Sequence, residues 1–300
     1  MRIRKKTLWI TGILIVVVLV FLFVYYFPNR DPYIRGADTF SYSKYRNTPD
    51  FQLSLLQQND SFDLYKVSFP GRTFLENKIT IFGLLVIPHS HANVPGVLLL
   101  PGGGVTKEAE LPHCRLISSW GYACLVIDQR GIGETAGIYL SFEDDYNVFL
   151  QGKEPIQHLS VYDALAAFDV MRSIGGIDSI AVAGLSMGGR YAIIAGALEP
   201  RFAGVVSIAS AGFHIKEIAS VEAEYVKSID PDSYVAMISP RPFVMLHGTN
   251  DSTVPIDEAR VTFSIAKEPK KFYTADGCGH GLCEGMYQNL SISLKEIFSQ

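Results

Sequence analysis

The stretch IAVAGLSMGGRYAIIAGAL, residues 180–198, constrains the fold more than any other part of the chain. Its first half is a short apolar run, typical of a fully buried strand, and its second half has the apolar spacing of a helix. Ser186 lies between the two halves, flanked by Gly184 and Gly188. Buried strands that alternate with helices belong to mostly parallel sheets. The sequence therefore predicts an α/β fold in which a tight turn presents one serine.

The rest of the chain repeats this alternation of strands and helices. Residues 62–71 and 78–88 have the pattern of antiparallel entry strands. Later apolar runs alternate with amphipathic segments, which predicts a mostly parallel sheet with helices on both faces. Buried strands are expected within residues 95–104, 122–131, 179–186, 204–210, 242–248 and 271–276, and helices within 159–174, 187–198 and 286–298.

The N-terminus departs from globular composition. Four of the first six residues are Lys or Arg, and an apolar run follows from Leu8 to Phe27. About 20 such residues span a bilayer, and the preceding positive charges predict a cytoplasmic N-terminus and an extracytoplasmic position for the rest of the chain. A cleaved signal peptide is the alternative. We expect a cytoplasmic tail at 1–7, a transmembrane signal anchor at 8–27, a stalk at 28–50 and the folded domain at 51–300.

Composition narrows the function classes. With 300 residues, 48% of them hydrophobic, the chain can bury one large core. The net charge of −4 and the absence of a basic block give no sign of nucleic acid as a partner. The cysteines match no zinc-site spacing, and we expect neither a metal nor an organic cofactor.

The pairing of the four cysteines is open from sequence alone. We favour free buried thiols, with a disulfide between Cys278 and Cys283 as the alternative. Such a disulfide would stiffen the loop that contains His280. The other two cysteines are Cys114 and Cys124.

Ser186 needs a base, because a free hydroxyl is a poor nucleophile. We predict His280 as this base, in the glycine-rich loop DGCGHGL between the last strand and the last helix. Asp251 in HGTNDSTVP also follows a strand, and we predict that it orients the imidazole. The alternatives are Asp276 for the carboxylate and His247 and His214 for the base.

A serine nucleophile also needs N–H donors for the oxyanion that forms on its substrate. The amide of Met187, the residue after the serine, is one expected donor. The glycine-rich loop PGGG at 101–104 should supply the other, because glycine lets the backbone approach a ligand closely. We predict Gly103 for this role, with Gly104 as the alternative.

Three motifs, GLSMGG, HGTNDSTVP and GCGHG, together resemble the α/β-hydrolase superfamily, with similarity to its dienelactone-hydrolase-like and prolyl-oligopeptidase-like branches. The resemblance covers about residues 51–300. It implies a triad of Ser186, Asp251 and His280, with Gly103 and Met187 as oxyanion donors. VIDQRGIGET resembles a D-x-R-G-x-G segment that is structural in many such enzymes.

Two positions depart from these patterns. The usual His-Gly of the oxyanion loop is Pro101-Gly102 here, and dienelactone hydrolases proper have a cysteine where this chain has Ser186. Large oligopeptidases carry β-propeller repeats before the domain, and this chain has none.

These features predict a membrane-anchored serine hydrolase that cleaves carboxylic esters through an acyl-enzyme. The expected partners are a small acyl ester or peptide and, through the N-terminal helix, the membrane. A peptidase or thioesterase would use the same triad, and a non-catalytic surface protein is the second alternative. Residues 139–155 and 212–237 fit no sheet element, so we expect them to be lid segments over the sheet. Apolar residues of the first segment would suit an acyl chain or pack on the core: Phe142, Tyr146, Val148, Phe149 and Leu150.

Overall fold

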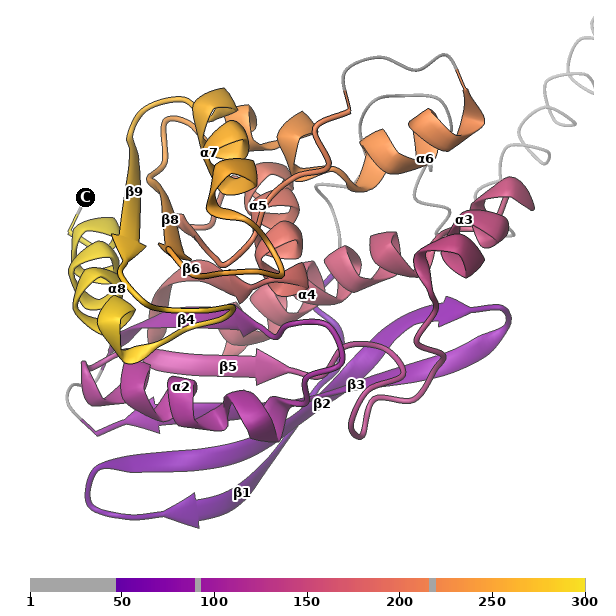
Figure 1. Ribbon diagram of the computed structural model, residues 1–300. Helices are drawn as coiled ribbons and strands as arrows, with labels where there is room; N and C mark the ends of the chain where they lie inside the picture. The colour runs from indigo at the N-terminus through magenta and orange to yellow at the C-terminus, as the bar shows by residue number, and fades with distance from the viewer. Residues whose placement is uncertain (1–46, 90–92, 216–219, 300) are drawn as a thin grey trace, which may run out of the picture. The chain divides into compact units, whose positions relative to one another are not determined.

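The computed structural model describes residues 47–89, 93–215 and 220–299, which belong to one compact unit. Their nine strands form one sheet in the order β1-β2-β3-β5-β4-β6-β7-β8-β9 (Figure 1). The strands are β1 (Gln52–Gln58), β2 (Phe62–Phe74), β3 (Asn77–Pro88), β4 (Val94–Leu100), β5 (Ala123–Ile127), β6 (Ile177–Leu185), β7 (Val205–Ile208), β8 (Phe243–Gly248) and β9 (Lys270–Ala275).

The pairing of the strands confirms a mostly parallel sheet with an antiparallel entry. β1, β2 and β3 pair antiparallel with one another, and β3 pairs antiparallel with β5. From β5 across to β9 every pairing is parallel. The strand order reverses between β4 and β6, and ligands of open α/β sheets bind at the carboxyl ends of the strands beside such a point.

Helices cover both faces of the sheet (Figure 1). Ile117 of α2 and Leu290 of α8 belong to one buried cluster with alternate side chains of the strands. On the other face, Gly196 of α5 packs closely on Val205, and Met171 of α4 packs on Gly96. The helices are α2 (Lys107–Ser119), α3 (Phe142–Leu150), α4 (Ile156–Ser173), α5 (Met187–Leu198), α6 (Val221–Ile229), α7 (Ile256–Ile265) and α8 (Glu284–Ile297), with 3-10 turns at Pro231–Ser233 and Val235–Met237.

The two predicted lid segments contain α3 and α6, which the sequence analysis did not predict. Ser141 and Ser220 cap these helices, each accepting a backbone N–H of the first turn. The helices are joined by a buried hydrogen bond, in which the hydroxyl of Tyr225 donates to Asp145 over 2.9 Å. Asp145 also accepts the amide of Ile156 at the start of α4. One carboxylate thus connects three helices.

The membrane anchor predicted at residues 8–27 requires a correction. Throughout the described residues no helix is long and apolar enough to cross a bilayer. The longest, α4, has 18 residues and includes Asp163 and Arg172, whereas a span needs about 20 apolar residues. The α/β part of the predicted fold class is confirmed, and the predictions of a transmembrane helix and of a single-pass localisation are corrected by this finding. Residues 8–27 lie outside the described residues, as do the predicted tail and most of the predicted stalk.

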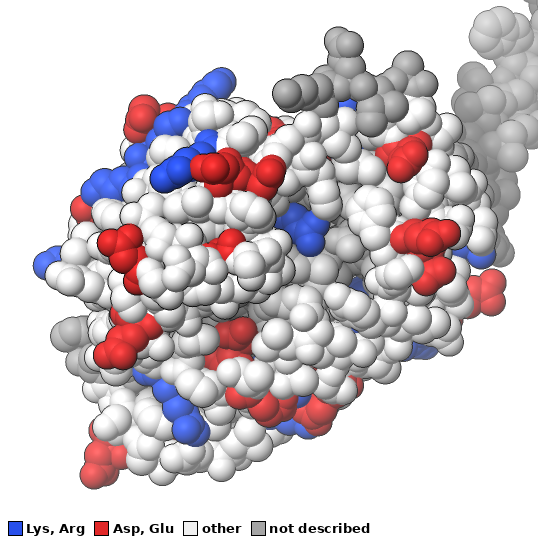
Figure 2. All heavy atoms as spheres, in the orientation of Figure 1, with Lys and Arg blue, Asp and Glu red and all other residues white. Residues whose placement is uncertain are grey.

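Acidic and basic side chains are interspersed over the face drawn in Figure 2, with no extended patch of one sign. A hollow near the centre of this face is lined mainly by uncharged groups, and Lys or Arg atoms are visible beside it.

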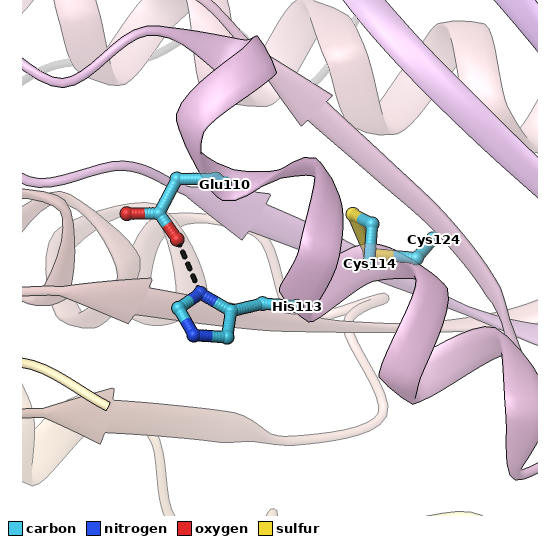
Figure 3. Close-up of a disulfide and its surroundings, with 4 residues drawn as sticks. All are labelled: Glu110, His113, Cys114 and Cys124. Atoms are coloured by element: carbon cyan, nitrogen blue, oxygen red, sulfur yellow. Dashed lines mark hydrogen bonds and ion pairs between the residues drawn. A yellow bond between two sulfur atoms is a disulfide. The ribbon is translucent and has the colours of Figure 1, made fainter. Parts of the chain in front are cut away.

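All four cysteines form disulfides, so the favoured interpretation of free thiols was wrong. Cys114 of α2 is bonded to Cys124 of β5, which ties the helix to the strand it covers (Figure 3). Beside this bond, His113 lies 2.6 Å from Glu110. The second disulfide joins Cys278 and Cys283 in the loop after β9. The second pair is the alternative that the sequence analysis named, whereas the sequence did not indicate the pair Cys114 and Cys124, because pairing depends on the distance between Cα atoms in the fold.

The D-x-R-G-x-G segment after β5 has a structural role, as its resemblance implied. Asp128 is buried and accepts both the amide and the ammonium of Lys107, each over 2.8 Å. Arg130 makes two hydrogen bonds to Asp163 of α4, over 2.6 and 2.7 Å. These buried ion pairs fasten the loop to both helix layers.

Removing one partner of the buried pair should be costly. Asp163→Ala leaves the Arg130 guanidinium buried without its carboxylate, so we expect a loss of about 3–5 kcal/mol in the free energy of unfolding. Urea unfolding would measure it. Asp257→Ala removes an exposed pair with Arg260 and should cost less than about 1 kcal/mol. Equal losses in the two variants would contradict this account.

Candidate active site

Ser186 stands at a sharp turn between β6 and α5. Its backbone has φ 51° and ψ −116°, in the left-handed half of conformational space that a residue with a Cβ rarely adopts. The turn is possible because both flanking positions lack a side chain. A Cβ at Gly184 would overlap the carbonyl of Gly188, and a Cβ at Gly188 would overlap the carbonyl of Leu100. The absence of side chains at Gly184 and Gly188 therefore allows the close packing of the backbone at this turn, and the same turn presents the serine hydroxyl.

His280 joins Ser186 to Asp251. Its Nε2 lies 2.8 Å from the Ser186 hydroxyl oxygen, and its Nδ1 lies 2.8 Å from Oδ2 of Asp251. Because a carboxylate only accepts, Nδ1 carries the proton and Nε2 is free to accept from the serine. The buried Asp251 also accepts the amides of Thr253 and Val254, each over 2.9 Å. The arrangement can take a proton from Ser186 and stabilise the resulting imidazolium.

Of the alternative residues only His247 lies near this line, with Nε2 3.4 Å from Oδ2 of Asp251, and the hydrogen bond to the Ser186 hydroxyl comes from His280. Asp276 is exposed at the end of β9, and no contact with His280 is found among the described residues. His247 is buried, donates to the carbonyl of Val254 and has its pKa lowered by burial. His214 points its two ring nitrogens at Asp232 and Glu258, over 2.6 and 2.9 Å.

The loop after β4 lies against the serine turn. A Cβ at Gly102 would lie 3.8 Å from the Ser186 Cβ, and one at Gly103 would lie 3.4 Å from the Met187 methyl carbon. Met187 is the first residue of α5, and the first amides of a helix lack intrahelical partners. Gly104 has φ 74° and faces open space. Both predicted oxyanion donors are therefore close to Ser186.

A narrow pocket lies beside the serine turn, and sequence reasoning missed most of its residues. Gln129 donates to the carbonyl of Pro101 over 2.6 Å, which holds the glycine loop, and its own carbonyl oxygen is buried without a hydrogen-bond partner in the described structure. The Tyr191 hydroxyl donates to Gln157 over 2.8 Å. The lining residues are Gln129, Arg130, Tyr139, Leu140, Ile156, Gln157, Ser160, Met187 and Tyr191. The one sequence signal was the place of Gln129 within the D-x-R-G-x-G segment, two residues after the end of β5.

The disulfide of Cys278 and Cys283 closes a short loop around His280. The carbonyl of Cys278 accepts the amide of Asn250 over 2.9 Å, next to Asp251 in the chain. The loop of the imidazole and the loop of the carboxylate are therefore fastened to one another at the cysteine.

A serine at a strand–helix turn, held by a histidine and an aspartate from the ends of later parallel strands, defines an α/β-hydrolase. More narrowly, the model of the acetyl xylan esterase family, AXE1, matches residues 41–224, and the chain belongs to this family. The match includes Ser186 and ends before Asp251. This membership confirms the prediction of an α/β-hydrolase superfamily enzyme.

Individual proteins agree with this assignment. The chain is 25% identical to protein YfhR of Escherichia coli O157:H7 over 199 residues, 63% of this chain and 60% of that protein. It is 31% identical to YtaP of Bacillus subtilis (strain 168), named as a hydrolase, over 173 residues, 54% of this chain and 56% of that protein. The chain thus spans about six tenths of the length of these relatives.

The crystal structure of acetyl xylan esterase 1 from Thermoanaerobacterium sp. JW/SL YS485 superposes with a TM-score of 0.69. The superposition covers 83% of this chain and 88% of that one, at 16% sequence identity. At this identity the likeness concerns the fold.

The serine turn should not tolerate a methyl group. Gly184→Ala places a Cβ against the Gly188 carbonyl, so we expect a loss of about 3 kcal/mol or more, or no soluble protein. Gly175→Ala is the matched control, because nothing lies within 4 Å of a Cβ there. It should change stability by about 1 kcal/mol at most. Urea unfolding of the two variants decides the point, and a stable Gly184→Ala protein would refute the steric argument.

The disulfide at Cys278 should set the reactivity of Ser186. We expect the double variant Cys278→Ser, Cys283→Ser to react with a fluorophosphonate about ten to a hundred times more slowly, because small displacements of a catalytic group are costly. Cys114→Ala with Cys124→Ala removes the other disulfide, and should lower the melting temperature without this loss of rate. Equal rates in the two double variants would show that His280 does not depend on its loop.

Proposed function

We propose that the protein is a serine hydrolase that cleaves carboxylic esters through Ser186, His280 and Asp251. The observation that carries the proposal is the continuous hydrogen-bonded line from the serine hydroxyl through both imidazole nitrogens to a buried carboxylate. Membership of an esterase family supports the choice of reaction.

The geometry supports a two-step reaction. Nε2 of His280 takes the proton of Ser186 while Oγ attacks the ester carbonyl carbon. The amides of Gly103 and Met187 donate to the oxyanion, and Asp251 stabilises the imidazolium. The alcohol leaves with the proton from Nε2. Water, deprotonated by the same nitrogen, then attacks the acyl-enzyme and releases the carboxylic acid.

The pocket beside Met187 favours a small acyl group. Its volume of about 20 Å³ is close to the space that one water molecule requires, about 10–15 Å³. An acetyl methyl group is of this size, and the family name refers to acetyl esters. Val148 and Phe149, which could have served a long acyl chain, are buried, and Phe149 packs on Tyr225. We therefore propose acetyl esters as the first substrates to examine.

The two predicted lid segments, which contain α3 and α6, supply part of the proposed ester-binding site. Phe142 of α3 lies 5.8 Å from the ring of Phe213 and 5.2 Å from that of Tyr225, measured between ring centroids. This aromatic group lies near the pocket residue Tyr191: burial raises the pKa of the Tyr225 hydroxyl, and Asp145 and Tyr191 add to the increase. We propose that it covers the bound ester.

Labelling of the serine tests the proposal most directly. A fluorophosphonate should add once to the wild-type protein and not to Ser186→Ala, as read from the intact mass. Hydrolysis of 4-nitrophenyl acetate should fall at least about a thousandfold in the variant, the scale on which triad members act.

A control excludes non-specific labelling. Ser173→Ala, an exposed serine at the end of α4, should label and hydrolyse as the wild type does. No adduct on a folded wild-type protein would overturn the proposal and favour a non-catalytic surface protein. An adduct that persists in Ser186→Ala would place the nucleophile elsewhere.

A further inference from the structure

Arg190 lies one helical turn after Ser186. Its amide donates to the Ser186 carbonyl over 3.3 Å, so the two residues share one side of the start of α5. Its guanidinium lies over the ring of Phe213, 4.7 Å from the centroid. Phe213 follows β7 at the carboxyl edge of the sheet. The contact therefore holds a cation at the edge where the serine is presented.

Arg190 differs from the other arginines that are withdrawn from solvent. Arg130 is paired with Asp163, and Arg72 lies 3.6 Å from Glu154. Arg241 is bonded to the backbone carbonyl of Glu199. Arg190 is half-buried, and among the residues that the structure describes no carboxylate or carbonyl bonds its guanidinium. A partly desolvated cation without an acid partner is unusual, because its hydration is lost without compensation.

The polar side chains near Arg190 are hydrogen-bonded to other groups. Burial raises the pKa of the Tyr191 and Tyr225 hydroxyls, and the positive charge of Arg190 opposes part of this increase. The nearby acid, Asp145, is occupied by the amide of Ile156 and the Tyr225 hydroxyl. Arg190 is partly withdrawn from solvent, which strengthens the attraction between the cation and a ligand of opposite charge.

We propose that Arg190 binds a carboxylate carried by the substrate, which makes the preferred substrates acidic esters. This inference rests on the proposed ester hydrolysis and specifies its substrate class. A guanidinium presents a planar set of donors that matches a carboxylate with two parallel hydrogen bonds. The carboxylate belongs either to the acyl part, as in a half-ester of a dicarboxylic acid, or to the alcohol part, as in an acetylated hydroxy acid or sugar acid.

Pairs of esters that differ in one charge test the inference on the full chain. For the alcohol part the pair is 4-acetoxybenzoate and 4-acetoxybenzamide. For the acyl part it is monomethyl glutarate and its neutral amide, methyl 4-carbamoylbutanoate. We expect the wild type to prefer the acid of one pair by about ten- to a hundredfold in kcat/KM, the scale of one charge-assisted hydrogen bond. Added salt should reduce this ratio.

The variants assign the preference to one side chain. Arg190→Gln should bring the acid-to-amide ratio close to one, and Arg190→Lys should retain part of it. Arg172→Gln removes the same charge from the exposed far end of α4 and should keep the wild-type ratio. Melting temperatures establish that the variants are folded.

Different experimental results would contradict the role of Arg190 and the proposed ester hydrolysis. A wild type that hydrolyses the neutral esters but shows no acid preference in either pair overturns the role of Arg190 and leaves ester hydrolysis intact. An acid preference that survives in Arg190→Gln also overturns it. A folded wild type that hydrolyses none of the four esters overturns the proposed function, and the inference with it.

Discussion

Close backbone contact at the serine turn is the constraint on which the candidate site depends. Because position 188 has no side chain, α5 begins against the carbonyl of Leu100, at the end of β4. That contact sets the glycine loop of residues 101–104 beside Met187. The same close contact thus presents the serine and brings the proposed oxyanion donors together. A methyl group at Gly184 or Gly188 would therefore disrupt both arrangements.

The other two proposed catalytic residues depend on a second local fastening. His280 and Asp251 come from loops after different strands, β9 and β8. Parallel pairing of these strands brings both loops to one edge, and the hydrogen bond from Asn250 to Cys278 sets their relative height. The parallel pairing of the strands explains why His280 and Asp251 lie close together. The hydrogen bond and the disulfide explain how the two side chains are aligned.

Periodic burial explains how much of the fold was predictable. The apolar runs that became β4 to β8 are buried on both faces, so their pattern could be recognised in the sequence. β1 was missed because all of its side chains are exposed at the edge of the sheet. Ser186, Asp251 and His280 each follow a strand within a recognisable motif. Gln129, Gln157 and Tyr191 come from three separate elements, and only the fold makes them one pocket wall.

The shared carboxylate of Asp145 has a mechanical consequence. It accepts the Tyr225 hydroxyl of α6 while it caps the first amides of α4 from its own position on α3. Withdrawing α6 would remove one donor from a buried charge, and withdrawing α3 would uncap α4 as well. Ser228 of α6 is also hydrogen-bonded to His158 of α4, over 2.7 Å. Movement of α6 would therefore break hydrogen bonds to both α3 and α4, and movement of α3 would in addition uncap α4, which contributes Ile156 and Gln157 to the pocket.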